Sequence, residues 1–149
     1  METLGGIVMG FIKKFAKEIS VFGVVLVIFL ALFTYRQITF KDFTTISEAK
    51  LADKIEAKDD FVVVLGDSTN STVLGYQEIM TKYTTKNRST PLYFVDSSTD
   101  DNFDSYVEET LGISVTYPAT IVVKDGEVVA KKEGAMQYYY LCDFIKQNY

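Results

Sequence analysis

The chain has no histidine, no tryptophan, one cysteine and two prolines among its 149 residues. Without histidine it lacks the usual general base at neutral pH and the commonest zinc ligand, so Ser-His catalysis, Cys-His catalysis and histidine-based metal centres are excluded. The lone Cys142 cannot form an internal disulfide or a CxxC pair, which excludes intramolecular dithiol exchange. We therefore expect no metal site and no bound cofactor.

Apolar residues are abundant, and the charge is divided unevenly. Hydrophobic residues make up 48% of the chain and charged residues 23%, a composition that supports a sizeable core and argues against disorder. Residues 1–40 carry a net charge of +2, whereas residues 41–149, with 11 basic and 18 acidic side chains, carry −7. Neutralising phosphates requires clustered lysine and arginine, so we expect no nucleic-acid partner.

The segment Ile19–Tyr35 is an uncharged apolar run of 17 residues. As a helix it would span about 25 Å, close to the roughly 30 Å core of a bilayer. A cleaved signal peptide is one alternative, but Leu30–Phe33 is bulky where a small-x-small cleavage site is needed. A buried core helix is another, but such a helix normally has a polar face, and this run has none. The run predicts a transmembrane helix at 19–35.

Basic residues before this run predict its orientation. Residues 1–18 form a basic amphipathic segment, which either prolongs the membrane helix or lies in the headgroup plane. Three lysines precede the apolar run and two basic residues follow it, namely Lys13, Lys14, Lys17, Arg36 and Lys41. This bias places the N-terminus in the cytoplasm and the remainder of a single-pass protein outside.

Beyond a predicted linker at 36–46, residues 47–149 predict one α/β domain. The β-branched run Phe61–Leu65 is typical of a strand buried on both faces. Asp125-Gly126 between two apolar alternations indicates a tight hairpin. The predicted elements are helix 48–57, strand 61–65, helix 72–83, strand 90–96, helix 103–111, strands 120–124 and 127–131, and helix 136–147. Because the last two strands are antiparallel, the sheet is mixed.

Three stretches of this domain resemble the thioredoxin-like proteins: FVVVLGDSTNSTV, PLYFVDSSTDD and GISVTYPATIVVKDGEVV. The third is the specific one, because the family carries Gly-Ile, then a cis-proline, then a strand ending in Asp-Gly or Asn-Gly. Here these are Gly112-Ile113, Tyr117-Pro118 and Asp125-Gly126. The resemblance covers about residues 40–149 and implies a thioredoxin-like fold, a central mixed sheet flanked by helices, preceded by one N-terminal transmembrane helix. Within the superfamily, the VVVLGDS opening looks most like the bacteriocin transport accessory branch.

The resemblance also locates the family's redox residues. Its two cysteines fall at Asn70 and Val73, so that Asn70-Ser71-Thr72-Val73 stands in place of CxxC. The buried carboxylate that assists the thiol in the family falls at Val64. None of these side chains forms a thiolate or takes a proton, so we expect no redox enzyme at this position.

The candidate binding residues are those of this loop together with Tyr117 and Pro118. In the family, the residue before the proline exposes a backbone edge that pairs with an extended peptide, which is binding by strand addition. The alternative is that Pro118 only fixes the approach of the chain to the strand. Asn70, Ser71 and Thr72 have a similar alternative, because these residue types cap helix N-termini.

Other residues have plainer explanations. Cys142 is expected to pack as a small apolar side chain in the last helix. The run Tyr138-Tyr139-Tyr140 is either a partner surface or part of the core, with core favoured. The acidic loop that contains Asp96 lacks the glycine and glutamate spacing of a calcium loop, so we expect it to be solvated.

These observations predict a non-catalytic accessory subunit of the bacterial cell membrane, with its C-terminal domain extracytoplasmic. Its partner would be an integral membrane protein, such as an ABC-type exporter in a bacteriocin export or immunity system, or a secreted peptide. One alternative is a thiol-disulfide oxidoreductase or isomerase that acts through Cys142 or through partner cysteines. Another is a chaperone that holds unfolded exported peptides.

Overall fold

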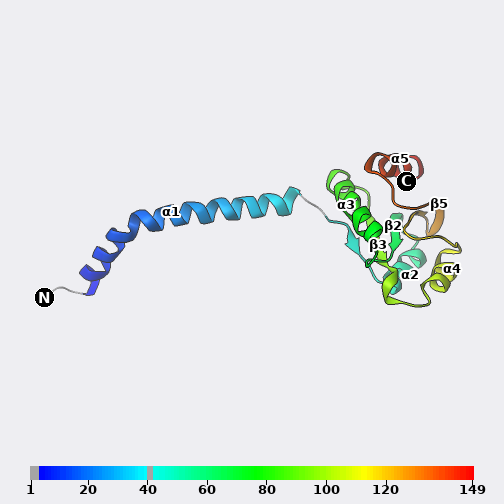
Figure 1. The fold of residues 1–149 in the computed structure, drawn as a ribbon, viewed down its shortest axis with the longest axis horizontal. Helices are drawn as coiled ribbons and strands as arrows, with labels where there is room; N and C mark the ends of the chain where they lie inside the picture. Colours follow the sequence, from blue (N-terminus) through cyan, green and yellow to red (C-terminus); the bar gives the residue numbers. More distant parts are fainter. Residues whose placement is uncertain (1–3, 40–41) are drawn as a thin grey trace. The chain divides into compact units, whose positions relative to one another are not determined.

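The computed structural model describes residues 4–39 and 42–149. The chain forms two compact units, residues 1–40 and residues 41–149, and each is described by itself (Figure 1).

The first unit is a single long helix, α1 (Leu4–Thr39). It is long and apolar enough to cross a membrane, with a mean hydropathy of 2.3 in its most apolar window. The helix starts at Leu4, so the amphipathic 1–18 segment is helical from this residue on. It also continues past Tyr35 to Thr39, where a linker was predicted, because Arg36 and Gln37 are good helix formers.

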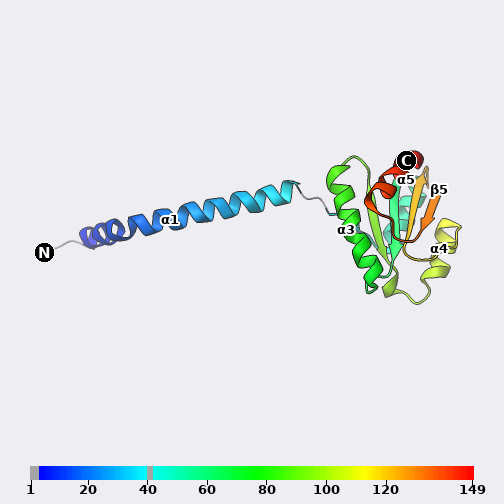
Figure 2. The same cartoon turned by 45° about the horizontal axis from the view of Figure 1, so that its top comes forward.

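The second unit is built on a five-stranded sheet in the order β1-β3-β2-β4-β5 (Figure 2). The strands are β1 (Thr44–Thr45), β2 (Phe61–Gly66), β3 (Leu92–Asp96), β4 (Ala119–Lys124) and β5 (Glu127–Glu133). Strands β1, β3 and β2 are parallel, while β4 and β5 are antiparallel to their neighbours. The central strand β2 is buried along its whole length, as its unbroken apolar sequence predicts.

Strand β1 was not predicted, because it lies inside the segment 36–46 that was taken as a linker. It has only two residues, too few for a periodic pattern. Its place at the sheet edge comes from pairing with Tyr93 and Phe94 of β3, a contact distant in sequence.

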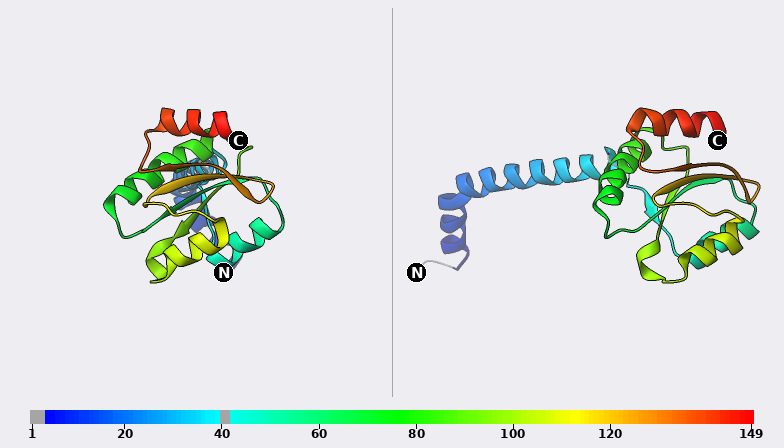
Figure 3. Two further views of the ribbon diagram at one scale, coloured as in Figure 1. Left: turned by 90° about the vertical axis from the view of Figure 1, so that its right-hand side faces the viewer. Right: turned by 45° about the vertical axis from the view of Figure 1, so that its right-hand side comes forward.

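Two helical layers cover the sheet. Helices α3 (Ser71–Lys86) and α5 (Tyr138–Asn148) pack on one face, and α2 (Glu48–Glu56) and α4 (Phe103–Leu111) on the other. Figure 3 shows α3 in green and α5 in red on one side of the strands, with α2 in cyan and α4 in yellow on the opposite side. Alternate residues of β2 therefore belong to different cores: Val62 and Val64 face α3 and α5, whereas Phe61 and Val63 face α2 and α4. A short 3-10 turn, η1 (Ser97–Thr99), follows β3.

Several element boundaries confirm local sequence signals. Ser47 caps α2 by accepting a hydrogen bond from the Lys50 amide, and Gly112 ends α4 in the left-handed region with φ 68°. Asp125 and Gly126, with φ values of 53° and 74°, form the predicted tight turn between β4 and β5. Helix α3 runs three residues beyond its predicted end, because Thr84 is buried and its hydroxyl bonds back to the Met80 carbonyl.

Candidate functional site

The loop between β2 and α3 is held by two carboxylates. Asp67 accepts hydrogen bonds from the amide and the hydroxyl of Thr69, at 2.8 and 2.6 Å. Asp96, the last residue of β3, accepts bonds from the amide and the hydroxyl of Ser68. Because β2 and β3 are parallel neighbours, their carboxyl ends meet at one edge, and Asp96 reaches the loop that leaves β2. These hydrogen bonds hold the loop after β2 in a defined turn.

Asp96 stays ionised well below neutral pH. Partial burial opposes its ionisation, but the hydrogen bonds from Ser68 and Ser98 outweigh the burial and lower the pKa of the carboxyl to about 2. Sequence reasoning missed this role, because it treated Asp96 as part of a solvated acidic loop. The available signal was an aspartate at the end of a strand whose parallel neighbour leads into a helix.

Asn70 caps helix α3, and the residues after it are exposed. Its side-chain oxygen accepts a hydrogen bond of 2.8 Å from the Thr72 amide. The capping interpretation of Asn70 is therefore confirmed. Ser71 and Thr72 occupy the first turn with their side chains in solvent, where a partner could touch them.

Val73 does not belong to an exposed binding surface, and the prediction was wrong for its side chain. Val73 is 2% exposed and packs in the α3 core. A Cβ added at Gly66 would lie only 3.1 Å from its Cγ1, which shows how closely the helix approaches β2. The helical spacing Val73, Tyr76, Met80, Tyr83 marks this buried stripe in the sequence.

The second loop ends at Tyr117-Pro118, immediately before β4, and its peptide bond is cis. Leu65 pairs with Ala119, so this loop and the loop after β2 leave the sheet at the same edge. The ring of Pro118 is buried. What this loop offers to solvent is therefore backbone rather than the proline ring.

Neighbouring atoms tether this backbone on both sides of Tyr117. The amide of Thr116 donates to a carboxylate oxygen of Glu133 at 3.1 Å, and the Pro118 carbonyl accepts from the Gly134 amide at 2.7 Å. Between these tethers, the backbone N–H and carbonyl of Tyr117 have no hydrogen-bond partner within residues 4–39 and 42–149. The backbone N–H and carbonyl of one residue, Tyr117, are therefore left unpaired at this edge.

The side chain of Tyr117 is committed to helix α4. Its ring lies edge-on to Phe103 with centroids 5.5 Å apart, and its hydroxyl donates to Asp104 at 2.7 Å. Partial burial and the Asp104 carboxylate raise the pKa of the Tyr117 hydroxyl well above its usual value. The ring is thereby fixed against α4.

Beneath the two loops lies a buried neutral pair. The hydroxyls of Tyr76 and Thr120 are 2.6 Å apart, and both side chains are almost fully buried. Thr120 pairs with Val64, near which the resemblance places the buried carboxylate that this chain lacks. Burial raises the pKa of Tyr76 to about 12, although the hydrogen bond to Thr120 opposes the rise. This pair does not exchange protons near neutral pH.

The remaining candidates lie elsewhere. Cys142 is half-buried in α5 and packs with Tyr138 on the α3 and α5 face, whereas Tyr117 packs on the opposite face. Tyr138 closes the core as favoured, but Tyr139 and Tyr140 are 77% and 67% exposed, so the core prediction was wrong for these two. Across residues 4–39 and 42–149, no group of three or more Cys, Asp or Glu side chains is placed to hold a metal ion.

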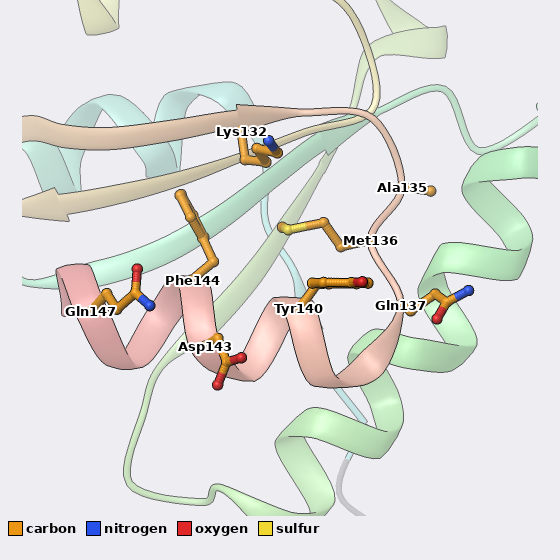
Figure 4. Close-up of a pocket in the computed structure, with 8 residues that line it drawn as sticks. All are labelled: Lys132, Ala135, Met136, Gln137, Tyr140, Asp143, Phe144 and Gln147. Atoms are coloured by element: carbon orange, nitrogen blue, oxygen red, sulfur yellow. The ribbon is translucent and has the colours of Figure 1, made fainter.

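A separate pocket of about 530 Å³ lies between β5 and α5 (Figure 4). Its lining consists of Lys132, Ala135, Met136, Gln137, Tyr140, Asp143, Phe144 and Gln147. The pocket is on the α5 side of the sheet and shares no residue with the two loops.

Comparison with known proteins identifies the fold. No family model and no curated protein matches the chain. Solved structures do match: thioredoxin f2 of Chlamydomonas reinhardtii has 16% identity and a TM-score of 0.57, covering 70% of this chain and 94% of that one. Thioredoxin O1 of Arabidopsis thaliana, in its oxidised state, has 12% identity and a TM-score of 0.55, covering 73% and 99%. The domain has the thioredoxin fold.

Desulfothioredoxin of Desulfovibrio vulgaris Hildenborough, in its reduced form, matches in the same way, with 16% identity, a TM-score of 0.55 and coverage of 72% and 99%. At these identities the thioredoxins share the fold alone with this chain. The thioredoxin-like resemblance read from the Tyr117-Pro118 and Asp125-Gly126 stretch is confirmed at that level.

Proposed function

We propose that this protein is a membrane-tethered, non-catalytic binding subunit whose thioredoxin-fold domain takes up an extended segment of a partner. The observation that carries the proposal is the unpaired backbone N–H and carbonyl of Tyr117, which lies between the tethered residues Thr116 and Pro118. An extended chain laid beside it would gain main-chain hydrogen bonds without disturbing any existing bond. The exposed side chains of Ser71 and Thr72 are at the same sheet edge and would form the opposite side of the binding surface.

The chemistry of the loops supports a role in binding rather than in redox catalysis. Asn70 is engaged as a helix cap and Val73 is buried, so neither offers a nucleophile. Cys142 packs on the other face of the sheet from Tyr117. Thiol exchange at this edge would therefore need cysteines supplied entirely by a partner.

Helix α1 supports tethering to a membrane. Its length and hydropathy fit a single membrane span, and an N-terminal signal sequence passes the same test. We favour an anchor, because the apolar run lacks a small-residue cleavage site. The lysines before the run favour a cytoplasmic N-terminus and an extracytoplasmic domain.

The partner class follows from this location. A domain held at the outer face of a bacterial membrane would meet integral membrane proteins and secreted peptides. The resemblance to the bacteriocin transport accessory branch favours an exporter or immunity complex among these.

Site-specific photo-crosslinking of the full-length protein in its native membrane tests the proposal. A photoreactive residue would replace Ser71 or Thr116 at the proposed edge, and Glu127 at the opposite end of the sheet as the matched control, since all three side chains are exposed. We expect a discrete adduct from the first two positions and none from the control. Absence of an adduct from both edge positions, or equal adducts from all three, would contradict the proposal.

An insulin-reduction assay checks the redox alternative. We expect no activity from the full-length protein. Activity that is lost in Cys142→Ser would show that the alternative is correct.

A further inference from the structure

Carboxylates hold both loops at the end of the sheet where the Tyr117 backbone is unpaired. Four acidic side chains make hydrogen bonds to one or other of the two loops or to the Tyr117 hydroxyl: Asp67, Asp96, Asp104 and Glu133. Every donor in these bonds is a neutral amide or hydroxyl group. The hydrogen bonds therefore orient the carboxylates and leave their negative charge in place.

Within residues 42–149, no cation forms an ion pair with these four carboxylates. Lys54 and Asp59 form the ion pair found among the described residues, and it lies at the opposite end of β2. Among the described lysines, Lys131 is the one whose ammonium hydrogen-bonds to either loop, donating to the Ser114 carbonyl at 3.2 Å. Four carboxylates against one ammonium leave this edge strongly negative.

The negative region continues past Asp96. Burial and the nearby Asp100 carboxylate raise the pKa of Glu48, so two acidic groups lie close together without an intervening cation. The low pKa of Asp96 keeps that carboxylate charged throughout the physiological range.

We infer that the segment taken up at Tyr117 is basic, an extended peptide stretch with lysine or arginine on either side of the paired residue. The inference rests on the proposed function and adds the charge of the partner. The charge complementarity acts over about 8 Å at physiological salt. Alternate side chains on an added strand lie about 7 Å apart, which is within that range. It would accelerate association with basic segments and discriminate against acidic ones.

Other occupants fit this edge less well. A second copy of the domain brings its own excess of acidic residues, 18 against 11 basic across residues 41–149. An anionic lipid surface would be repelled for the same reason.

The test uses the full-length protein in zwitterionic lipid nanodiscs and three labelled twelve-residue peptides of one alternating sequence. The peptides carry Lys, Gln or Glu at the same four positions, and their dissociation constants are measured at low and at high salt. We expect the Lys peptide to bind at least tenfold more tightly than the Gln peptide at low salt, and the Glu peptide to bind most weakly. High salt should shrink these ratios to about threefold or less.

A charge-removing double variant, Asp104→Asn with Glu133→Gln, keeps an acceptor for each hydrogen bond. We expect the preference of this variant for the Lys peptide over the Gln peptide, taken as the ratio of the two dissociation constants, to fall about fivefold. The matched control, Asp53→Asn with Glu127→Gln, removes two exposed carboxylates elsewhere and should leave both values unchanged.

The possible failures are distinguishable. Equal binding of all three peptides by the unmodified protein would overturn the inference and leave the proposed function intact. Binding of none of them, together with no crosslink from Thr116, would overturn the proposed function and the inference with it. If the double variant does not fold, the peptide series on the unmodified protein still decides.

Discussion

The two ends of the sheet are built differently. At the hairpin end, a Cβ on Gly126 would collide with the Ile55 carbonyl in the last turn of α2, so the turn rests directly on the end of that helix. The Asp125 amide there donates to Asp60 at 2.8 Å, and Lys54 pairs with Asp59 at 3.5 Å. At the other end, two loops are tied by carboxylates to neutral donors, and the backbone of Tyr117 is left unpaired.

The hairpin end of the sheet contributes to stability, whereas the loop end offers groups for binding. Close backbone packing and paired charges close the hairpin end, which leaves nothing for a partner to complete. At the loop end, the residues next to Tyr117 are hydrogen-bonded. The backbone N–H and carbonyl of Tyr117 have no partner, and several carboxylates have no cation beside them. Unpaired groups of this kind cost nothing in water and gain hydrogen bonds when a partner is bound.

The largest effect is expected at the closed end. We expect Gly126→Ala to destabilise the domain by about 3 kcal/mol, because alanine must adopt a φ of 74° and its Cβ meets the Ile55 carbonyl. The matched variant is Gly134→Ala at the loop end, where φ is 88° but no atom lies within 4 Å of the added Cβ. It should lose only about 1 kcal/mol. Denaturant unfolding of the full-length protein in detergent measures both, and equal losses would remove the contrast.

The second-largest loss of stability is expected at the buried Tyr76–Thr120 pair beneath the loops. We expect Tyr76→Phe to cost about 2 kcal/mol, because the buried Thr120 hydroxyl loses its partner. Adding Thr120→Val removes the orphaned hydroxyl and should recover part of the loss. Strictly additive losses in the double variant would show that the two hydroxyls do not depend on each other.

We expect the ionised Asp96 to contribute about 1 kcal/mol to the free energy of unfolding, a value that allows for screening of this partly exposed group by solvent. Its folded pKa of about 2 lies below the unfolded value near 4. A depressed pKa gives stability that is fully present above pH 4 and is lost as the pH falls toward 2. We therefore expect Asp96→Asn to be less stable than the unmodified protein at pH 6, and the difference to shrink to about a third at pH 2.5. A gap that persists unchanged at pH 2.5 would show that ionisation plays no part.

The smallest effect concerns the paired charges of the hairpin end. Lys54→Met keeps the apolar stem but loses the ion pair with Asp59 and the contact of the ammonium with the Tyr93 ring, 4.6 Å away. We expect a loss of about 0.5 kcal/mol at low salt and less at high salt. An effect above 1 kcal/mol would mean that the charges of this end matter more than its backbone packing.

The fold was largely predictable because its strongest signals are local. The β-branched run of β2, the Asp-Gly turn and the Gly112 stop each define an element without reference to distant residues. Strand β1 was missed because only its pairing with Tyr93 and Phe94 makes it a strand. The site was less predictable for the same reason. The capping role of Asn70 can be predicted from the residues next to it. The hydrogen bonds from Glu133 and Gly134 on either side of Tyr117 come from the end of β5, which is distant in sequence.

Amide hydrogen exchange at Tyr117, with and without saturating bound partner or basic peptide, tests the central claim most directly. The account predicts that the Tyr117 amide exchanges freely alone and becomes strongly protected on binding, while the amides of the Asp125-Gly126 turn do not change. A Tyr117 amide that exchanges at the same rate in the complex as in the free protein would contradict it.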